Sequence, residues 1–310
     1  MILVAGSANL DFVVRADHIP SPGETVLGRD FQTFPGGKGA NQAVACSRAG
    51  GAATTMLLAL GNDAFAKPLE DSLQGAGVTL LTQRAAQPTG TAFICLAANG
   101  ENAITVAPGA NGSLRPEHLP DLAGITHLLL QLEIPLDAVT AYAKAAKSAG
   151  VTVLLNAAPA RALPPELLDA VDILIFNEGE LAVVANHGGS IADCLRQLKV
   201  PTVVVTLGAR GCVARHMDTL FLQASFAIEP VDTTGAGDTF CGGLCAALSQ
   251  GKSMDAALRY ASAAGALACT QLGAQSSVPT AAAVTALLAE QPQNNSPARL
   301  DALRTLCGLT

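Results

Sequence analysis

The sequence of 310 residues contains no tryptophan, only 2 tyrosines, and a charged fraction of just 14%. Lys and Arg together number 18 against 25 Asp and Glu, which gives a net charge of -7, and no basic run occurs. Because nucleic-acid-binding proteins present a basic surface to phosphates, we expect no nucleic-acid partner. No apolar run approaches the roughly 18 residues of a membrane-spanning helix, so we expect no membrane association either.

The eight cysteines are scattered and include no CxxC pair, and no signal peptide precedes them. They are typical of small buried apolar residues in a reducing compartment, so we expect a cytoplasmic protein. Half of all residues are hydrophobic, which suits one large domain or one domain with a small appendage.

The N-terminal apolar run 2–6 predicts a central parallel strand. The turn after it lacks the G-x-G-x-x-G pattern of dinucleotide-binding folds, which argues against an oxidoreductase. Instead, Asn9 and Asp11 follow the strand at its carboxyl end, where open α/β sheets bind ligands. They can hydrogen-bond to a polyol, and an Asx-turn is the alternative interpretation.

Two separate segments predict one small β-sheet. Residues 12–35 show no helical period, and Asn99-Gly100 joins two β-rich runs in the manner of a hairpin. We therefore expect a lid made of 12–35 and 88–108, on a core made of 1–11, 36–87 and 109–310.

The rest of the chain alternates between strands and helices. Strands are predicted over 54–60, 127–133, 151–155, 173–176 and 203–205, and helices over 63–74, 136–148, 254–272 and 281–288. The last four strands end in Glu133, Asn156, Asn177 and Thr206, which is the expected arrangement of a ligand crevice. A short helix over 298–306 follows a polar linker and has no predicted position.

A glycine-rich turn at Gly36-Gly37-Lys38 leads into a helix that runs to Gly50-Gly51. It is not a P-loop, because Gly rather than Ser or Thr follows the lysine. The glycines leave room for a ligand against the backbone, and Asn41 can point at it from the first helical turn. A plain helix start is the alternative.

The most informative stretch is residues 231–240, in which Gly235, Ala236 and Gly237 precede Asp238 at the start of a small, apolar helix. Free N–H groups at a helix start bind phosphate, but a carboxylate there repels it. A substrate hydroxyl between the two resolves the conflict, since Asp238 can accept its proton while the loop stabilises the transferred phosphoryl group. The alternative is that Asp238 is the N-cap of the helix. Glu178 and Glu180, nearby in the crevice, suit Mg²⁺.

Several motifs resemble the ribokinase-like (PfkB) carbohydrate kinases, from residue 2 to about residue 288. They are G-S-x-N-x-D near the start, G-G-K-G-A-N-Q-A at 36–43, Q-L-E at 131–133, N-E-x-E at 177–180, T-L-G-x-x-G at 206–211, D-T-x-x-A-G-D-T-F at 232–240 and G-A-Q-x-S-V-P at 273–279. The resemblance implies a three-layer α/β/α fold with a mostly parallel sheet and a small β-sheet lid that pairs two subunits into a homodimer. It also implies ATP-dependent phosphorylation of D-ribose at O5, with Mg²⁺ and a monovalent cation such as K⁺.

The resemblance further implies roles for individual residues. Asp238 would be the base and Gly235, Ala236 and Gly237 the anion hole. The sugar would be held by Asn9, Asp11, Gly37, Lys38, Asn41, Glu133 and Asp238. The nucleotide and its Mg²⁺ would meet Asn177, Glu180, Thr206, Gly208, Gly211, Gly237 and Ser262, although the family often has Asn or His at the position of Ser262. The monovalent cation would lie among Asp232, Thr234, Ala268, Gln271, Gly273 and Ser277.

Other functions remain open on the sequence. A kinase of the same fold can act on another pentose, a ketohexose or a nucleoside, but a nucleoside needs an apolar or aromatic slot for its base. A sugar-binding regulator without activity would not require a base in the anion hole, so the presence of Asp238 favours a kinase.

Overall fold

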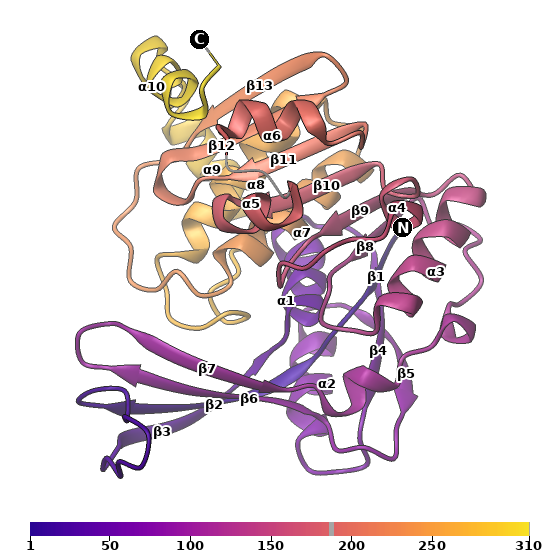
Figure 1. Cartoon of the computed structure of the whole chain (residues 1–310), viewed down its shortest axis with the longest axis vertical. Helices are drawn as coiled ribbons and strands as arrows, with labels where there is room; N and C mark the ends of the chain where they lie inside the picture. The colour runs from indigo at the N-terminus through magenta and orange to yellow at the C-terminus, as the bar shows by residue number, and fades with distance from the viewer. Residues whose placement is uncertain (186–188, 310) are drawn as a thin grey trace.

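The computed structural model describes residues 1–185 and 189–309. Its large sheet has nine strands in the order β13-β12-β11-β10-β9-β8-β1-β4-β5 (Figure 1). Strand β1 (Ile2–Ala5) lies inside the sheet, third from the β5 edge, and is parallel to both neighbours, β4 (Thr54–Leu60) and β8 (His127–Leu130). All four residues of β1 are buried, which is why this strand is continuously apolar.

The remaining strands extend this sheet on both sides. Strands β5 (Thr79–Arg84), β9 (Thr152–Asn156) and β10 (Ile173–Asn177) are parallel to their neighbours, and β11 (Thr202–Thr206) is parallel to β10 and antiparallel to the next strand. Strands β12 (Gly211–His216) and β13 (Thr219–Ala224) form an antiparallel hairpin at one edge. The sheet is therefore mostly parallel, as predicted, but β5, β12 and β13 were not predicted from the sequence.

Helices cover both faces of the sheet and give the three predicted layers. One face carries α1 (Lys38–Val44), a π-helix (Ala45–Ala49), α2 (Ala66–Gly75), α7 (Ala236–Ser249), α8 (Met254–Ala268) and α9 (Ala281–Glu290). The other carries α3 (Leu136–Ser148), α4 (Pro165–Leu168), α5 (Glu178–Ala185), α6 (Ile191–Gln197) and α10 (Pro297–Cys307). Short 3-10 turns occupy Gly109–Ser113, Pro116–His118 and Gly208–Arg210.

A second sheet of four strands projects from the core at the lower left of Figure 1. Its order is β3 (Arg29–Gly36), β2 (Asn9–Ala16), β6 (Gly90–Ala97) and β7 (Asn102–Ala107). Strand β2 pairs with β6 in parallel, while the two outer pairs are antiparallel. The predicted smaller sheet is thus present, and two distant segments of the chain build it.

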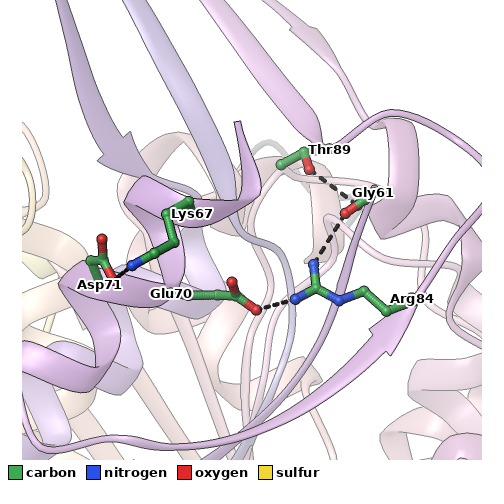
Figure 2. Close-up of polar contacts among 6 residues, drawn as sticks. All are labelled: Gly61, Lys67, Glu70, Asp71, Arg84 and Thr89. Atoms are coloured by element: carbon green, nitrogen blue, oxygen red, sulfur yellow. Dashed lines mark hydrogen bonds and ion pairs between the residues drawn. The ribbon is translucent and has the colours of Figure 1, made fainter. Parts of the chain in front are cut away.

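Polar contacts attach the base of this small sheet to the core, as Figure 2 shows. Arg84, at the end of β5, forms an ion pair with Glu70 of α2 and donates to the carbonyl oxygen of Gly61 at 3.1 Å. The Gly61 N–H donates to the Thr89 hydroxyl oxygen at 3.0 Å, directly before β6. Helix α2 also carries a surface ion pair between Lys67 and Asp71.

Three predicted boundaries are wrong, each because of a tertiary contact. Helix α8 ends at Ala268 rather than Leu272, because the Cys269 carbonyl accepts hydrogen bonds from the N–H groups of Val231 and Asp232. Helix α2 begins at Ala66 rather than Asp63, whose carboxylate binds the N–H groups of Phe65 and Thr89. Strand β8 ends at Leu130, because the chain then turns to donate from Leu132 N–H to the Ala158 carbonyl.

The C-terminal segment, which the sequence left without a position, covers the edge strand β13 (Figure 1). The side chains of Asn294 and Asn295 bind the carbonyl and N–H groups of Ala224 at 2.8 and 2.9 Å. Leu303 and Cys307 of α10 are buried in the core cluster that includes α3. Among the described residues, none of the helices has the length and apolar character needed to cross a bilayer.

Candidate active site

Asp238 lies in the first turn of α7, directed toward α1. Its Oδ2 accepts a hydrogen bond from Asn41 Nδ2 at 2.9 Å, and its Oδ1 accepts one from Gln42 Nε2 at 2.9 Å. The N-cap of α7 is Gly235, so the interpretation of Asp238 as an N-cap is wrong. Its carboxylate is instead oriented by two amides from another helix.

Gly235 and Gly237, which precede Asp238, are glycines for different structural reasons. Gly235 has a left-handed φ of 74°, and a Cβ there would lie 2.9 Å from Ala274 Cα. A Cβ on Gly237 would meet no atom of the described residues outside its own helix turn within 4 Å, so this residue opens to space that a ligand can fill. The Ala236 N–H donates to the Thr233 carbonyl at 3.2 Å. The N–H groups of Gly237 and Asp238 occupy the first turn, where a helix offers no carbonyl partner.

A cavity of about 150 Å³ adjoins this turn at the carboxyl ends of β9, β10 and β11. It is lined by Lys38, Asn156, Ala158, Ile175, Phe176, Asn177, Glu180, Thr206, Gly235, Gly237, Asp238 and Cys241. A second cavity, of about 410 Å³, lies between α1, α2 and the loop 274–276. Although larger, this second cavity has Arg48 as its one charged lining residue and no carboxylate, so we assign acid–base chemistry to the smaller one.

In the region predicted to bind the sugar, several carboxylates lie near the ammonium group of Lys38. Burial, followed by the charges of Glu133 and Asp238, raises the pKa of Asp11 to about 7. Burial alone would lower the pKa of Lys38, but the carboxylates of Asp238, Glu133 and Glu180 raise it. Lys38 is therefore held as a cation among these acids.

Backbone and amide contacts shape the same region. The Lys38 N–H and the Ser7 hydroxyl both donate to Glu133 Oε2, at 3.1 and 2.5 Å. Gly37 has a φ of 89°, and a Cβ there would lie 2.8 Å from Ala8 Cα, so only glycine lets these two segments of the backbone approach each other. The Oδ1 atom of Asn41 is buried and has no hydrogen-bond partner within the described chain. This unpaired acceptor is available to a ligand hydroxyl.

The predicted nucleotide residues are only partly brought together. Asn177 and Glu180 bind each other reciprocally at the start of α5, with both N–H to side-chain distances at 2.8 Å. Burial raises the pKa of Glu180. Thr206 lies beside them in the cavity and donates to the Phe176 carbonyl at 3.2 Å. Glu178, by contrast, forms an ion pair with Arg210 and does not line the cavity.

Three other nucleotide predictions fall outside the cavity lining. Gly208 is exposed, with open space around its Cα. A Cβ on Gly211 would lie 2.0 Å from the Gln223 carbonyl oxygen, so this glycine serves the packing of β12 on β13. The Ser262 hydroxyl contacts Cys212 Sγ at 3.7 Å.

The predicted cation segments lie side by side. Asp232 Oδ1 accepts hydrogen bonds from the N–H and hydroxyl of Thr234, at 2.9 and 2.7 Å, and Oδ2 accepts one from Gly273 N–H at 2.9 Å. Although burial raises the pKa of Asp232, these hydrogen bonds lower it overall. Ala268 and Ser277 are buried on the same segment, whereas Gln271 is exposed. The bond to Gly273 N–H places the Asp232 carboxylate, whose hard oxygens are the kind that bind hard cations, against the segment 268–277.

Sequence reasoning missed several polar residues behind the site. Gln42 and Gln131 are fully buried and bonded to each other, and Asn111 Nδ2 donates to Asn9 Oδ1 at 2.7 Å. Gln42 and Gln131 were part of quoted motifs but had no assigned role, because a single sequence does not show which partners an amide has.

Comparisons with known proteins identify the family of this chain. The model of the pfkB family of carbohydrate kinases matches residues 1–281. The chain belongs to this family. The match confirms the predicted class of enzyme, an ATP-dependent carbohydrate kinase.

Individual relatives are similar over nearly the whole chain. A ribokinase from Bacillus subtilis is 39% identical over 293 residues, which cover 93% of this chain and 99% of the relative. The crystal structure of a ribokinase from Thermotoga maritima has a TM-score of 0.85 and 34% identity, covering 93% and 99% of the two chains. The structure of an Arabidopsis thaliana ribokinase complexed with ribose and ATP has a TM-score of 0.83 and 35% identity, covering 93% and 98%.

Proposed function

We propose that this carbohydrate kinase transfers the γ-phosphoryl group of ATP to O5 of D-ribose, giving D-ribose 5-phosphate and ADP. The ribokinase relatives support the choice of sugar and donor. The observation that carries the proposal is the Asp238 carboxylate, which is oriented by two amides beside the open space at Gly237.

In the proposed reaction, the sugar O5 hydroxyl lies between Asp238 and the γ-phosphate. Asp238 accepts the hydroxyl proton, O5 forms a bond to phosphorus, and the bond from phosphorus to the bridging oxygen of ADP breaks. The N–H groups of Gly237 and Asp238, at the positive end of the α7 dipole, stabilise charge on the transferred group. The Lys38 ammonium, which lines the same cavity, adds a positive charge.

Two cations would support this chemistry. Glu180 and Asn177, which line the cavity, offer oxygen atoms suited to Mg²⁺ and its waters on the phosphate side. Asp232, with Thr234 and the carbonyl groups of 268–273 and Ser277, would hold a monovalent cation such as K⁺ behind the anion hole. When bound, these ions neutralise phosphate charge and hold the loop in position.

The sugar would be bound by Asn9, Asp11, Gly37, Lys38, Asn41 and Glu133. Because a site built to pair with a hydroxyl is left with unpaired groups when that hydroxyl is missing, ribose should be preferred over 2-deoxyribose. A coupled assay of ADP release with ribose, 2-deoxyribose, fructose, adenosine and no sugar tests this. The highest kcat/KM with ribose is expected, whereas equal values for ribose and 2-deoxyribose, or a preference for adenosine, would contradict the ribose assignment without affecting the family.

We further propose that residues 12–35 and 88–108 act as a lid over the sugar and as the contact of a homodimer. Apolar side chains exposed on the face of the small sheet that carries Asp11, among them Ile104 and Val106, support this role. An isolated sheet of this size needs a cover on its apolar face.

A further inference from the structure

The side chain of Gln42 connects the proposed base to the sheet behind it. It is fully buried on α1 and makes three hydrogen bonds. Nε2 donates to Asp238 Oδ1 at 2.9 Å and to Asn156 Oδ1 at 3.0 Å, and Oε1 accepts from Gln131 Nε2 at 2.7 Å. Both N–H hydrogens of the amide therefore have an acceptor.

The ionised carboxylate fixes the direction of this chain of amides. Because a carboxylate only accepts hydrogen bonds, Gln42 must turn its NH₂ group toward Asp238. Its oxygen then faces Gln131, which must donate. Asn156, the second acceptor of the Gln42 NH₂ group, is itself held in place because its Nδ2 donates to the Ile175 carbonyl of β10 at 3.3 Å. The amides are thus anchored on a buried strand and point at Oδ1 of the base.

We propose that Gln42 is a positioning residue that holds the Asp238 carboxylate in the orientation needed for proton transfer. The proposal rests on the proposed function, in which Asp238 is the general base. With Gln42 on Oδ1 and Asn41 on Oδ2, both oxygens are fixed, and each retains a lone pair for the substrate proton. The carboxylate cannot rotate without breaking one of these two partly buried hydrogen bonds.

Gln42 and Asn41 differ in what else they can touch. Asn41 Oδ1 is unpaired and belongs to the predicted sugar site, so its loss should affect sugar binding as well as catalysis. Gln42 does not line the cavity, and its partners are all protein atoms. Its loss should therefore appear in kcat and leave KM unchanged.

The test is the Gln42→Leu variant, which keeps the size of the side chain and removes its hydrogen bonds. We expect kcat to fall about 10-fold to 100-fold, the scale of a misplaced reacting group, with KM for sugar and ATP within about twofold of wild type. The loss should be confined to kcat, because Gln42 holds the base and does not line the cavity. A residue that serves packing alone would lower the stability without this split between kcat and KM.

Two further variants keep the test decisive. Gln223→Leu is the matched control, because Gln223 is also buried and hydrogen-bonded but lies on β13; its kcat and KM should stay at wild type. If Gln42→Leu does not fold, Gln131→Leu tests the next amide in the chain. It should show the same fall in kcat with unchanged KM, and unchanged kinetics would overturn the proposal.

Combining the change with Asp238→Asn separates this inference from the proposed function. If Gln42 acts through Asp238, Gln42→Leu should cause no additional loss in the Asp238→Asn background. Full activity of Asp238→Asn alone would reject the base itself. A strongly impaired Asp238→Asn enzyme together with a normal Gln42→Leu enzyme would keep the base and reject the positioning role.

Discussion

At the scale of single residues, Asp238 combines two requirements that normally conflict. It places a negative charge in a helix start that attracts phosphate, and amides from α1 hold that charge in position. Asp238→Asn keeps the shape and removes the proton acceptor. We expect kcat to fall by about 10²-fold to 10⁴-fold, the usual contribution of a positioned base, with nearly unchanged binding of ATP and ribose. Steady-state kinetics and calorimetric titration measure both, and full activity would reject the role of Asp238.

Asp11 offers a second prediction, on stability. Burial and the nearby Glu133 and Asp238 raise its pKa from 3.8 to about 7. Since the folded state binds the proton more tightly than the unfolded state, the free energy of unfolding falls as the pH rises from about 4 to about 7. Asp11→Asn removes this penalty, so at pH 8 it should be more stable than wild type by on the order of 1 to 4 kcal/mol.

Urea unfolding at pH 5 and pH 8 checks this prediction. The gain in stability should be clearly smaller at pH 5, and sugar binding should weaken at both pH values because the pocket loses an acceptor. Asp301→Asn, at an exposed position on α10, is the control and should behave alike at both pH values. A gain that does not depend on pH would show that the charge of Asp11 is not the cause.

At the scale of elements, the sequence predicts those with strong local signals. The hairpin between β6 and β7 was identified from Asn99-Gly100, and Gly100 has the positive φ of 88° that such a turn needs. The hairpin between β12 and β13 was missed, because Met217 takes the left-handed φ of 49° there and Met carries no turn signal. Helix ends set by tertiary contacts, such as Cys269 after α8, were not predicted for a different reason, because the hydrogen-bond partner is distant in sequence.

The candidate site likewise contains residues that the sequence predicts and residues that it does not. The motif residues that line the cavity, such as Lys38, Asn177 and Asp238, lie at the end of a strand or in the first turn of a helix. This placement can be predicted from the sequence. The roles of Gln42 and Gln131 depend on hydrogen bonds that join α1 to α7 and α1 to the residue directly after β8. These partners cannot be predicted from the sequence. Gly211 was assigned to the nucleotide, but its close approach to Gln223 is a packing feature that spacing alone does not reveal.

Helix α10 gives a prediction that belongs to an element. It covers the edge strand β13, and Leu303 is 3% exposed there. Leu303→Ala should lower the free energy of unfolding by about 2 to 5 kcal/mol, because it leaves a cavity in the core. Leu306→Ala, on the same helix but 40% exposed, should cost much less. Urea denaturation measures both, and equal effects would show that α10 is not docked as described.

The contact between the segment at 232–234 and the segment at 268–277 leads to a prediction on salts. We expect activity to rise with K⁺ and much less with Na⁺ at constant ionic strength, mainly in kcat, because a bound cation would hold the anion-hole loop in place. Titrations of KCl, NaCl and choline chloride at saturating ATP, Mg²⁺ and ribose test this. Asp232→Asn should remove the difference between salts. Equal rates of the wild type in all three salts would leave Asp232 as a structural residue only.

At the scale of the whole molecule, the two sheets differ in how they are covered. The large sheet has helices on both faces, whereas the small sheet projects from the core (Figure 1). One row across the small sheet joins Asp11, Ala92 and Val106, and the next row on the same face joins Val13, Ile94 and Ile104. The first row contains Asp11 of the proposed sugar site. The second row extends the apolar surface of the same face toward the tip of the sheet.

This apolar continuation predicts that a second copy of the chain covers the lid. Ile104 is 55% exposed in the single chain, and Thr105 beside it on β7 points to the opposite face. Ile104→Lys should therefore convert a dimer into a monomer in light scattering after size-exclusion chromatography, since burying an unpaired ammonium group is strongly unfavourable. Thr105→Lys adds the same charge on the other face and should remain dimeric. Because the lid also closes the sugar site, the Ile104→Lys monomer should show a raised KM for ribose with little change in KM for ATP. A wild-type monomer, or a dimer that survives Ile104→Lys, would contradict a contact through this face.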